Sequence, residues 1–212
     1  MVRRFWRTVS AQPAIRPFTE WRIWLQWRAA GRPVPPPPFV KQRLLRQCAA
    51  RYGLRTFVET GTFAGETTAA LAASVERIIS IELDPPLAEA ARVRFAAAPH
   101  ITILEGNSGE LLRRAIASLT DPALFWLDGH YSGSITARGA QDSPITDEIE
   151  AILAHPARGH VVLIDDARHL NGCDGYPTID ALRERILSRA PGSRLDVADD
   201  IITWIGPGSA SA

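Results

Sequence analysis

The segment 57–68, with the sequence FVETGTFAGETT, constrains the fold more than any other part of the chain. Its first residues, phenylalanine and valine, favour a short buried strand, and the alanine-rich run that follows it favours a helix. Between them, Gly61 and Gly65 allow positive φ and a close approach of a ligand or a neighbouring strand. The segment therefore predicts a strand, a glycine turn and a helix, with Glu59 at the strand end, where open α/β sheets bind ligands.

The rest of the chain alternates between short strand-forming runs and helical runs. We expect strands near 56–60, 77–82, 101–105, 123–127, 161–164, 194–197 and 201–205. We expect helices near 39–52, 65–75, 85–97, 109–118, 144–154 and 178–189. This alternation predicts an α/β fold, with a mostly parallel sheet covered by helices on both faces. The pair Asp199-Asp200 suggests a hairpin turn between the last two strands.

The 212 residues suit one α/β domain with a modest extension. We divide the chain into a basic, Trp-rich extension with a proline spacer (1–38), a domain (39–206) and a flexible tail (207–212). Residues 1–46 carry ten of the 24 basic residues but only one of the 23 acidic ones. The overall net charge of +1 nevertheless argues against binding to nucleic acid driven by total charge, so no nucleic-acid partner is expected.

The extension contains four of the six tryptophans. Helical spacing places Trp21, Trp24, Leu25 and Arg28 near one face. A helix with that face could pack on the domain or cover its pocket, rest on a membrane surface, or bind a partner protein. The two cysteines show no metal-type spacing, no segment resembles a signal peptide, and no apolar run of about 20 residues occurs. We therefore expect a reduced, cytoplasmic protein.

The spacing of the glycines distinguishes between cofactor classes. Nicotinamide and flavin sites use G-x-G-x-x-G, whereas this chain has Gly61-x-x-x-Gly65 with Glu59 two residues before the first glycine. The segment resembles motif I, E/D-x-G-x-G-x-G, of class I S-adenosylmethionine-dependent methyltransferases. Phe63 stands where the middle glycine usually does, and this is similar to metal-dependent small-molecule O-methyltransferases of the catechol and caffeoyl-CoA type. An ordinary strand–helix turn is the alternative interpretation.

The resemblance covers about 55–205 and implies the Rossmann-like sheet of that family, with strand order 3-2-1-4-5-7-6. It also implies S-adenosylmethionine as cofactor. Glu82, 21 residues after Gly61, would accept hydrogen bonds from the ribose hydroxyls, and Asn107 would contact adenine. Alternatively, Glu82 is an exposed acid and Asn107 caps the next helix. The cofactor-binding residues expected in this way are Glu59, Thr60, Gly61, Thr62, Gly65, Glu82, Asn107, Ser108 and Asp128.

Three aspartates follow two strands that would be neighbours in this sheet. Asp128 ends one strand, and Asp165 and Asp166 end the next, although consecutive side chains on an extended backbone diverge. Carboxylates gathered in one pocket repel unless a cation lies among them, and Mg²⁺ prefers such oxygen ligands. The pattern is similar to the metal ligands of catechol-type and macrolide sugar O-methyltransferases. Without an ion, we expect a raised pKa for at least one of them. The alternative is that Asp128 orients the cofactor while the others cap a loop.

Asp128, His130 and His169 are the candidate catalytic residues. His130 is the best candidate general base because imidazole titrates near neutrality. Catechol-type enzymes use a lysine near this strand, but the only lysine of this chain, Lys41, lies far upstream. Residues 127–133 also resemble bacterial methyltransferase-like proteins of undefined substrate.

These resemblances imply a methyltransferase that modifies a hydroxyl of a sugar or small polar metabolite, with the assistance of a divalent cation. A homo-oligomer is a further expectation. Two alternatives remain open. The chain could be a binding protein that has kept the sheet and lost the chemistry, or a nucleic-acid methyltransferase that uses its basic N-terminal arm. The Asn/Asp-Pro-Pro-aromatic motif of amino-group methylases is absent after residue 127, which argues against the second.

Overall fold

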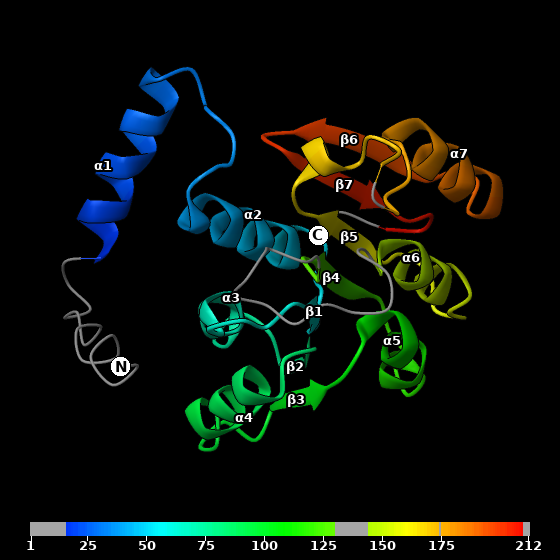
Figure 1. Cartoon of the computed structure of the whole chain (residues 1–212), viewed down its shortest axis with the longest axis horizontal. Helices are drawn as coiled ribbons and strands as arrows, with labels where there is room; N and C mark the ends of the chain where they lie inside the picture. The colour runs from blue at the N-terminus through cyan, green and yellow to red at the C-terminus, as the bar shows by residue number, and fades with distance from the viewer. Residues whose placement is uncertain (1–15, 130–143, 174, 210–212) are drawn as a thin grey trace.

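The computed structural model describes residues 16–129, 144–173 and 175–209 (Figure 1). Its helices are α1 (Arg16–Ala29), α2 (Pro38–Arg51), α3 (Glu66–Leu71), α4 (Pro85–Arg94), α5 (Ser108–Ile116), α6 (Ile145–Leu153) and α7 (Ile179–Arg189), with a short 3₁₀ helix η1 (Ala167–His169). Its strands are β1 (Thr56–Thr60), β2 (Arg77–Glu82), β3 (Ile101–Glu105), β4 (Ala123–Leu127), β5 (Val161–Ile164), β6 (Arg194–Ala198) and β7 (Ile201–Ile205). The predicted alternation of strands and helices is confirmed.

All seven strands form one sheet in the order β3-β2-β1-β4-β5-β7-β6, which confirms the expected topology. Strands β1 to β5 pair in parallel, and β7 is antiparallel to β5 and β6. In the centre of the sheet, Val58 is in register with Ile79 on one side and Phe125 on the other. The carboxyl ends of the five parallel strands therefore lie at one edge.

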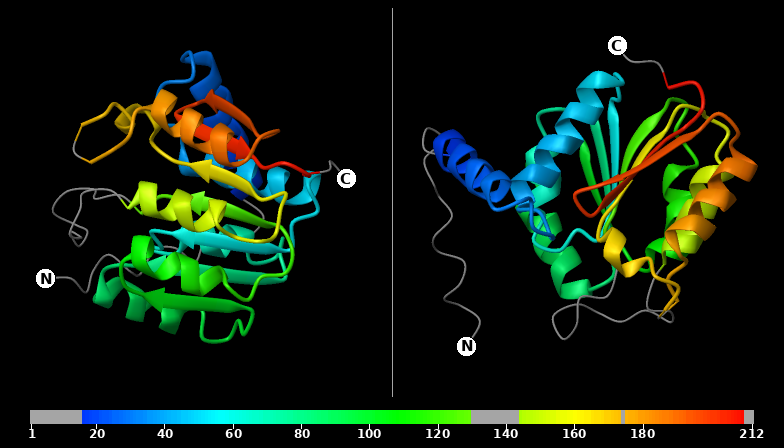
Figure 2. Two further views of the ribbon diagram at one scale, coloured as in Figure 1. Left: turned by 90° about the vertical axis from the view of Figure 1, so that its right-hand side faces the viewer. Right: turned by 90° about the horizontal axis from the view of Figure 1, so that it is seen from above.

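Helices cover both faces of the sheet, with α2, α3 and α4 on one face and α5, α6 and α7 on the other (Figure 2). Alternate residues of the central strands supply the two cores. Phe57 and Trp126 pack in the core under α2 and α3, whereas Val58 and Phe125 pack in the core under α5 and α6. Because both faces are covered, β4 (ALFWL) and β5 (VVLI) are apolar along their whole length rather than alternating.

Polar residues at the strand ends also begin the helices that follow. The Asp84 carboxylate accepts a hydrogen bond from the Leu87 amide at 3.1 Å at the start of α4. The Asn107 side chain accepts one from the Gly109 amide at 2.9 Å at the start of α5. Asn107 therefore has the capping role that was one of its two interpretations.

The N-terminal helix α1 lies on the outer side of α2, away from the sheet (Figure 2). Trp24, on the predicted face of α1, is half-buried, and the guanidinium carbon of Arg43 on α2 lies 5.7 Å from its ring centre. Trp21 and Leu25, on the same face, are not buried but 55% and 39% exposed. Trp27 is buried instead, and its indole N–H donates to the Pro33 carbonyl at 2.8 Å. The local turn into the proline segment covers this tryptophan, which periodicity alone does not predict.

Two further contacts join the predicted N-terminal extension and C-terminal tail to the sheet and its loops, and the division of the chain stays a prediction. Arg32, in the extension, forms an ion pair with Asp199 in the turn between β6 and β7. Ser209, at the start of the expected flexible tail, donates a hydrogen bond to the Gly159 carbonyl at 3.0 Å. Both Asp199 and Asp200 have positive φ, which confirms the predicted hairpin turn.

Among the described residues, no helix is both long enough and apolar enough to cross a membrane. Cys48 is buried, Cys173 is exposed, and both are free thiols.

Candidate active site at the carboxyl edge of the sheet

The glycine turn after β1 packs tightly against the end of β4. Gly61 has a φ of +83°, and a β-carbon there would lie 2.4 Å from the carbonyl oxygen of Asp128. Gly65, with a φ of +73°, begins α3, and a β-carbon there would lie 2.8 Å from the Phe95 ring. Both glycines are therefore required by backbone conformation and by close approach, as the motif predicted.

Glu82 ends β2 with its carboxylate fixed beside this turn. Its two oxygens accept hydrogen bonds from the backbone amides of Phe63 at 2.7 Å and Asp84 at 2.9 Å. The residue is only 5% exposed, so it is not the exposed acid of the alternative interpretation. Each carboxylate oxygen has a second lone pair, so the pair can still accept hydrogen bonds from two vicinal hydroxyls.

Glu59 lies beneath the turn rather than on its surface. Its carboxylate accepts hydrogen bonds from the hydroxyls of Thr68 and of Ser80, the latter at 2.6 Å, and Ser80 also contacts Thr62 at 2.6 Å. Burial raises the pKa of Glu59 to about 8; the two hydroxyls oppose this shift, and the nearby acids add to it. These contacts link Glu59 to α3 and β2, and a direct contact with the cofactor stays a prediction.

A further buried carboxylate, Glu148, which the sequence analysis missed, lies beside Gly129 at the end of β4. A β-carbon on Gly129 would lie 3.2 Å from the hydroxyl oxygens of Thr60 and Ser108 and 3.3 Å from Glu148 Oε1. Glu148, on α6, is 1% exposed. The Thr60 hydroxyl is fully buried and makes no hydrogen bond within the described part of the chain. A charged residue inside the apolar stripe of 145–152 was the signal that could have revealed Glu148.

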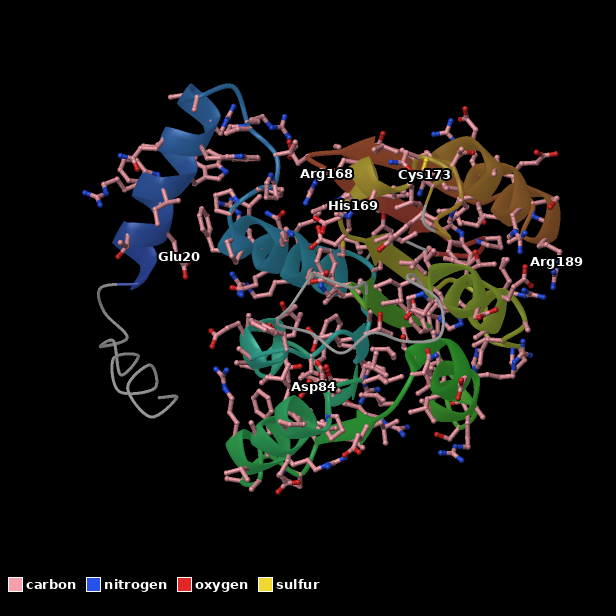
Figure 3. All side chains as sticks on the ribbon, in the orientation of Figure 1. Glu20, Asp84, Arg168, His169, Cys173 and Arg189 are labelled. Carbon is pink, nitrogen blue, oxygen red and sulfur yellow. The ribbon has the colours of Figure 1, made fainter. Side chains whose placement is uncertain are left out.

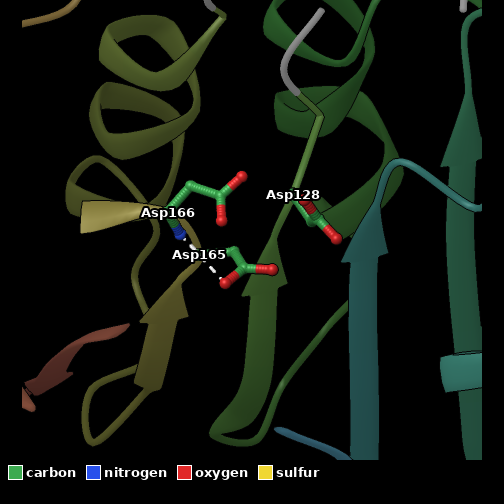
Figure 4. Close-up of side chains that lie close together, drawn as sticks. All are labelled: Asp128, Asp165 and Asp166. Carbon is green, nitrogen blue, oxygen red and sulfur yellow. Dashed lines mark hydrogen bonds between the residues drawn. The ribbon is translucent and has the colours of Figure 1, made fainter. Parts of the chain in front are cut away.

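The three predicted metal ligands come together. Asp128, Asp165 and Asp166 each place a carboxylate oxygen within 4.8 Å of the others (Figure 4). The expected divergence of Asp165 and Asp166 does not occur, because Asp166 adopts the left-handed conformation with a φ of +53°. This bend also lets the Asp166 amide donate to Asp165 Oδ1 at 2.9 Å.

The protein supplies two of its own cations to this cluster. Lys41, on α2, forms an ion pair with Asp165 Oδ2. Arg168 donates to Asp166 Oδ1 at 2.8 Å and also binds Asp200 in the β6–β7 turn. Lys41 is therefore close to the site although it is far upstream in the sequence, which corrects the assumption that no lysine is near these strands.

Burial raises the pKa of Asp165, as expected for a carboxylate in such a cluster without an ion. The ammonium of Lys41 opposes this shift, and the neighbouring charge of Asp166 adds to it. Of the two causes that raise this pKa, loss of water around Asp165 is therefore larger than repulsion by Asp166.

Of the predicted catalytic residues, the structure describes Asp128 and His169 but not His130. His169 lies on η1 next to Arg168 (Figure 3), and its ring centre is 6.1 Å from that of Tyr176. Tyr176 lines a pocket between the ends of β4 and β5, together with Asp165 and Glu148. His130 lies outside the described residues, so its role as a base stays a prediction.

Three-dimensional comparison finds similar solved structures that cover nearly the whole chain. The O-methyltransferase from Bacillus cereus, in complex with S-adenosylhomocysteine, has a TM-score of 0.59 and 15% identity, and covers 94% of this chain and 93% of its own. The O-methyltransferase TomG from Streptomyces achromogenes, involved in tomaymycin synthesis and in complex with S-adenosylmethionine, has a TM-score of 0.59 and 20% identity, and covers 94% and 92%.

Sequence comparison gives one partial match. Over 80 residues, or 38% of this chain, the sequence is 38% identical to the ribosomal RNA small subunit methyltransferase A of Acidobacterium capsulatum. The match spans 27% of that relative's length. No protein-family model matches the chain. The strand order and the structural likenesses together show that the chain has the class I S-adenosylmethionine-dependent methyltransferase fold.

Proposed function

We propose that the protein is an S-adenosylmethionine-dependent methyltransferase that modifies a hydroxyl of a sugar or another small polar metabolite. The observation that carries this proposal is the gathering of functional groups at one edge of the sheet. Glu82 is fixed beside the glycine turn at the end of β2, and the aspartate cluster lies at the ends of β4 and β5. One end of this edge suits a methyl donor and the other suits an acceptor.

The residues of the turn fit the cofactor by their chemistry. Glu82 offers two carboxylate oxygens to the ribose hydroxyls, and Gly61 brings the backbone of the turn against Asp128 without an intervening side chain. Thr60 and Ser108 place hydroxyl oxygens around Gly129, next to the same strand end. When bound, S-adenosylmethionine supplies an electrophilic methyl group. The chain's own task is then to orient the acceptor in line and to accept its proton.

The aspartate cluster fits a divalent cation, because it offers three hard oxygen ligands within 4.8 Å of one another. We propose that Asp128, Asp165 and Asp166 would hold Mg²⁺ or a similar ion. An ion bound there would lower the pKa of an acceptor hydroxyl and fix its direction. The likeness of the fold to the two O-methyltransferases supports the choice of oxygen as the acceptor atom.

Calorimetry with S-adenosylhomocysteine tests the cofactor part of this proposal, and transfer of a labelled methyl group to a panel of sugars and small hydroxyl compounds tests the reaction. We expect binding, and turnover that falls in excess chelator and returns with Mg²⁺. A folded protein that does not bind S-adenosylhomocysteine would exclude the proposed activity. Binding without turnover on any acceptor would favour the scaffold that has lost its chemistry.

Methylation of RNA is the second candidate function. It is favoured by the partial identity to a ribosomal RNA methyltransferase and by the basic composition of residues 1–46. The absence of an Asn/Asp-Pro-Pro-aromatic motif after β4 argues against modification of an amino group. An RNA gel shift that weakens steeply with salt, together with methyl transfer to that RNA, would favour this function over the first.

A further inference from the structure

Lys41 is the only lysine of the protein, and the other 23 basic residues are arginines. Its ammonium group contacts the carboxylate of Asp165, at the end of β5. The two side chains are 18% and 1% exposed, so the contact is almost completely shielded from water. The ammonium also lies 6.0 Å from the centre of the Trp126 ring, on the neighbouring strand β4.

This contact competes with any other ligand of Asp165. Asp165 Oδ1 already accepts the Asp166 amide at 2.9 Å, and Oδ2 binds Lys41. A divalent cation that used this buried carboxylate would meet the positive charge of Lys41 on the same group. Because water screens this place poorly, the repulsion between the two cations is strong.

Building on the proposed function, we propose that Lys41 is a resident counter-cation that competes with a divalent metal for Asp165 and so sets the metal affinity of the site. In the state without metal, its ammonium satisfies the buried carboxylate. When a metal binds, the side chain withdraws toward solvent. The competing charge therefore comes from one side chain of α2, whereas the metal ligands follow β4 and β5.

The surroundings of Lys41 allow such a movement without displacement of the helix. Leu45, Cys48 and Ala49 anchor α2 in the core, whereas Lys41 lies on its first turn and is partly exposed. Its four-carbon stem ends in a compact ammonium that can rotate away. An arginine at this position would present a rigid fork that suits a bidentate pair with one carboxylate.

Titration of the full-length protein with Mn²⁺, followed by electron paramagnetic resonance, measures the competition directly. We expect Lys41→Met to bind Mn²⁺ at least about tenfold more tightly than the parent, because it removes the competing charge. Arg43→Met is the matched control: it removes one charge from the same helix, and its guanidinium lies over Trp24 rather than against the aspartates. We expect Arg43→Met to leave the affinity unchanged.

The single lysine permits a second measurement on the parent protein. Reductive methylation with mass spectrometry reports how accessible the Lys41 amine is. We expect labelling of Lys41 to increase when Mg²⁺ is added, and to be high without Mg²⁺ in Asp165→Asn, where the partner charge is lost. Calorimetry with S-adenosylhomocysteine on each variant checks that the cofactor site is intact.

Equal Mn²⁺ affinity of Lys41→Met and parent would overturn the competition, as would labelling that does not change while the metal binds. Failure of every variant to bind Mn²⁺ would also overturn it. In each of these cases, methyl transfer and binding of S-adenosylhomocysteine by the parent protein would show that the proposed methyltransferase survives the failure of this inference.

Discussion

The carbonyl oxygen of Asp128 lies only 2.4 Å from the position that a β-carbon on residue 61 would take, so Gly61 leaves room for it. The end of β4 and the turn after β1 are therefore in direct backbone contact. This contact brings the cofactor side and the acceptor side of the candidate site together.

Gly61→Ala should destabilise the fold and weaken binding of S-adenosylhomocysteine. The new methyl group would meet the Asp128 carbonyl, and alanine at positive φ costs about 1–2 kcal/mol. Gly53→Ala is the control, because Gly53 has a φ of +60° with no atom within 4 Å of the added β-carbon. Denaturation should show a loss for Gly61→Ala that exceeds the control by roughly 1–3 kcal/mol. Equal losses of stability in the two variants would mean that positive φ alone accounts for the need for glycine at position 61.

Glu82→Ala should weaken binding of S-adenosylhomocysteine by about 1–3 kcal/mol, the scale of lost hydrogen bonds to a charged group. Glu105→Ala is the control, because Glu105 is in register with Glu82 on β3 but is exposed and paired with Arg92. Calorimetry of both variants gives the comparison. Unchanged affinity in folded Glu82→Ala would remove Glu82 from the cofactor site.

The stability of the fold should depend on Glu59 between about pH 5 and pH 8. Its pKa in the folded protein, about 8, is higher than the ordinary value of 4.5, so folding favours the protonated form. The stabilising contribution is complete below pH 4.5 and is lost as the pH rises to 8, by up to about 1.4 kcal/mol per pH unit. Glu59→Gln should flatten this dependence in urea denaturation across the range. Glu76→Gln is the control: at this exposed position, paired with Arg55, the variant should show the same dependence of stability on pH as the parent.

Asp165→Asn should reduce methyl transfer at least about tenfold while binding of S-adenosylhomocysteine stays close to that of the parent. The carboxylate belongs to the aspartate cluster, where it would hold the proposed cation and orient the acceptor hydroxyl. Single-turnover assays and calorimetry separate the two effects. Full turnover of this variant, or of the parent in excess chelator, would remove the metal from the mechanism.

A chain that begins at Pro38 should still fold and bind S-adenosylhomocysteine. It lacks α1 and the Arg32–Asp199 ion pair, but this exposed pair contributes little to stability. It keeps α2, and with it Lys41 and the core residue Leu45. Loss of binding in a folded chain of this length would place the N-terminal segment in the cofactor site.

The sequence by itself determined the order of elements and the edge of the sheet at which the candidate site lies. Short apolar runs ending in a carboxylate indicated parallel strands, and the carboxyl ends of such strands meet at one edge. That rule was sufficient to bring Glu82, Asp128 and Asp165 to the same side of the molecule. The glycine turn was also predictable, because positive φ and close backbone approach require glycine at particular positions of a short segment.

Only the tertiary structure decided which groups complete the site. Lys41 reaches Asp165 across 124 positions because α2 packs on the face of the sheet beside β4, and no local pattern encodes that docking. The left-handed backbone of Asp166 turned two divergent carboxylates into neighbours, and the packing of α6 buried Glu148 beside Gly129. Periodicity reports which face of an element is apolar. The partner of each polar side chain depends on where separate elements meet in space.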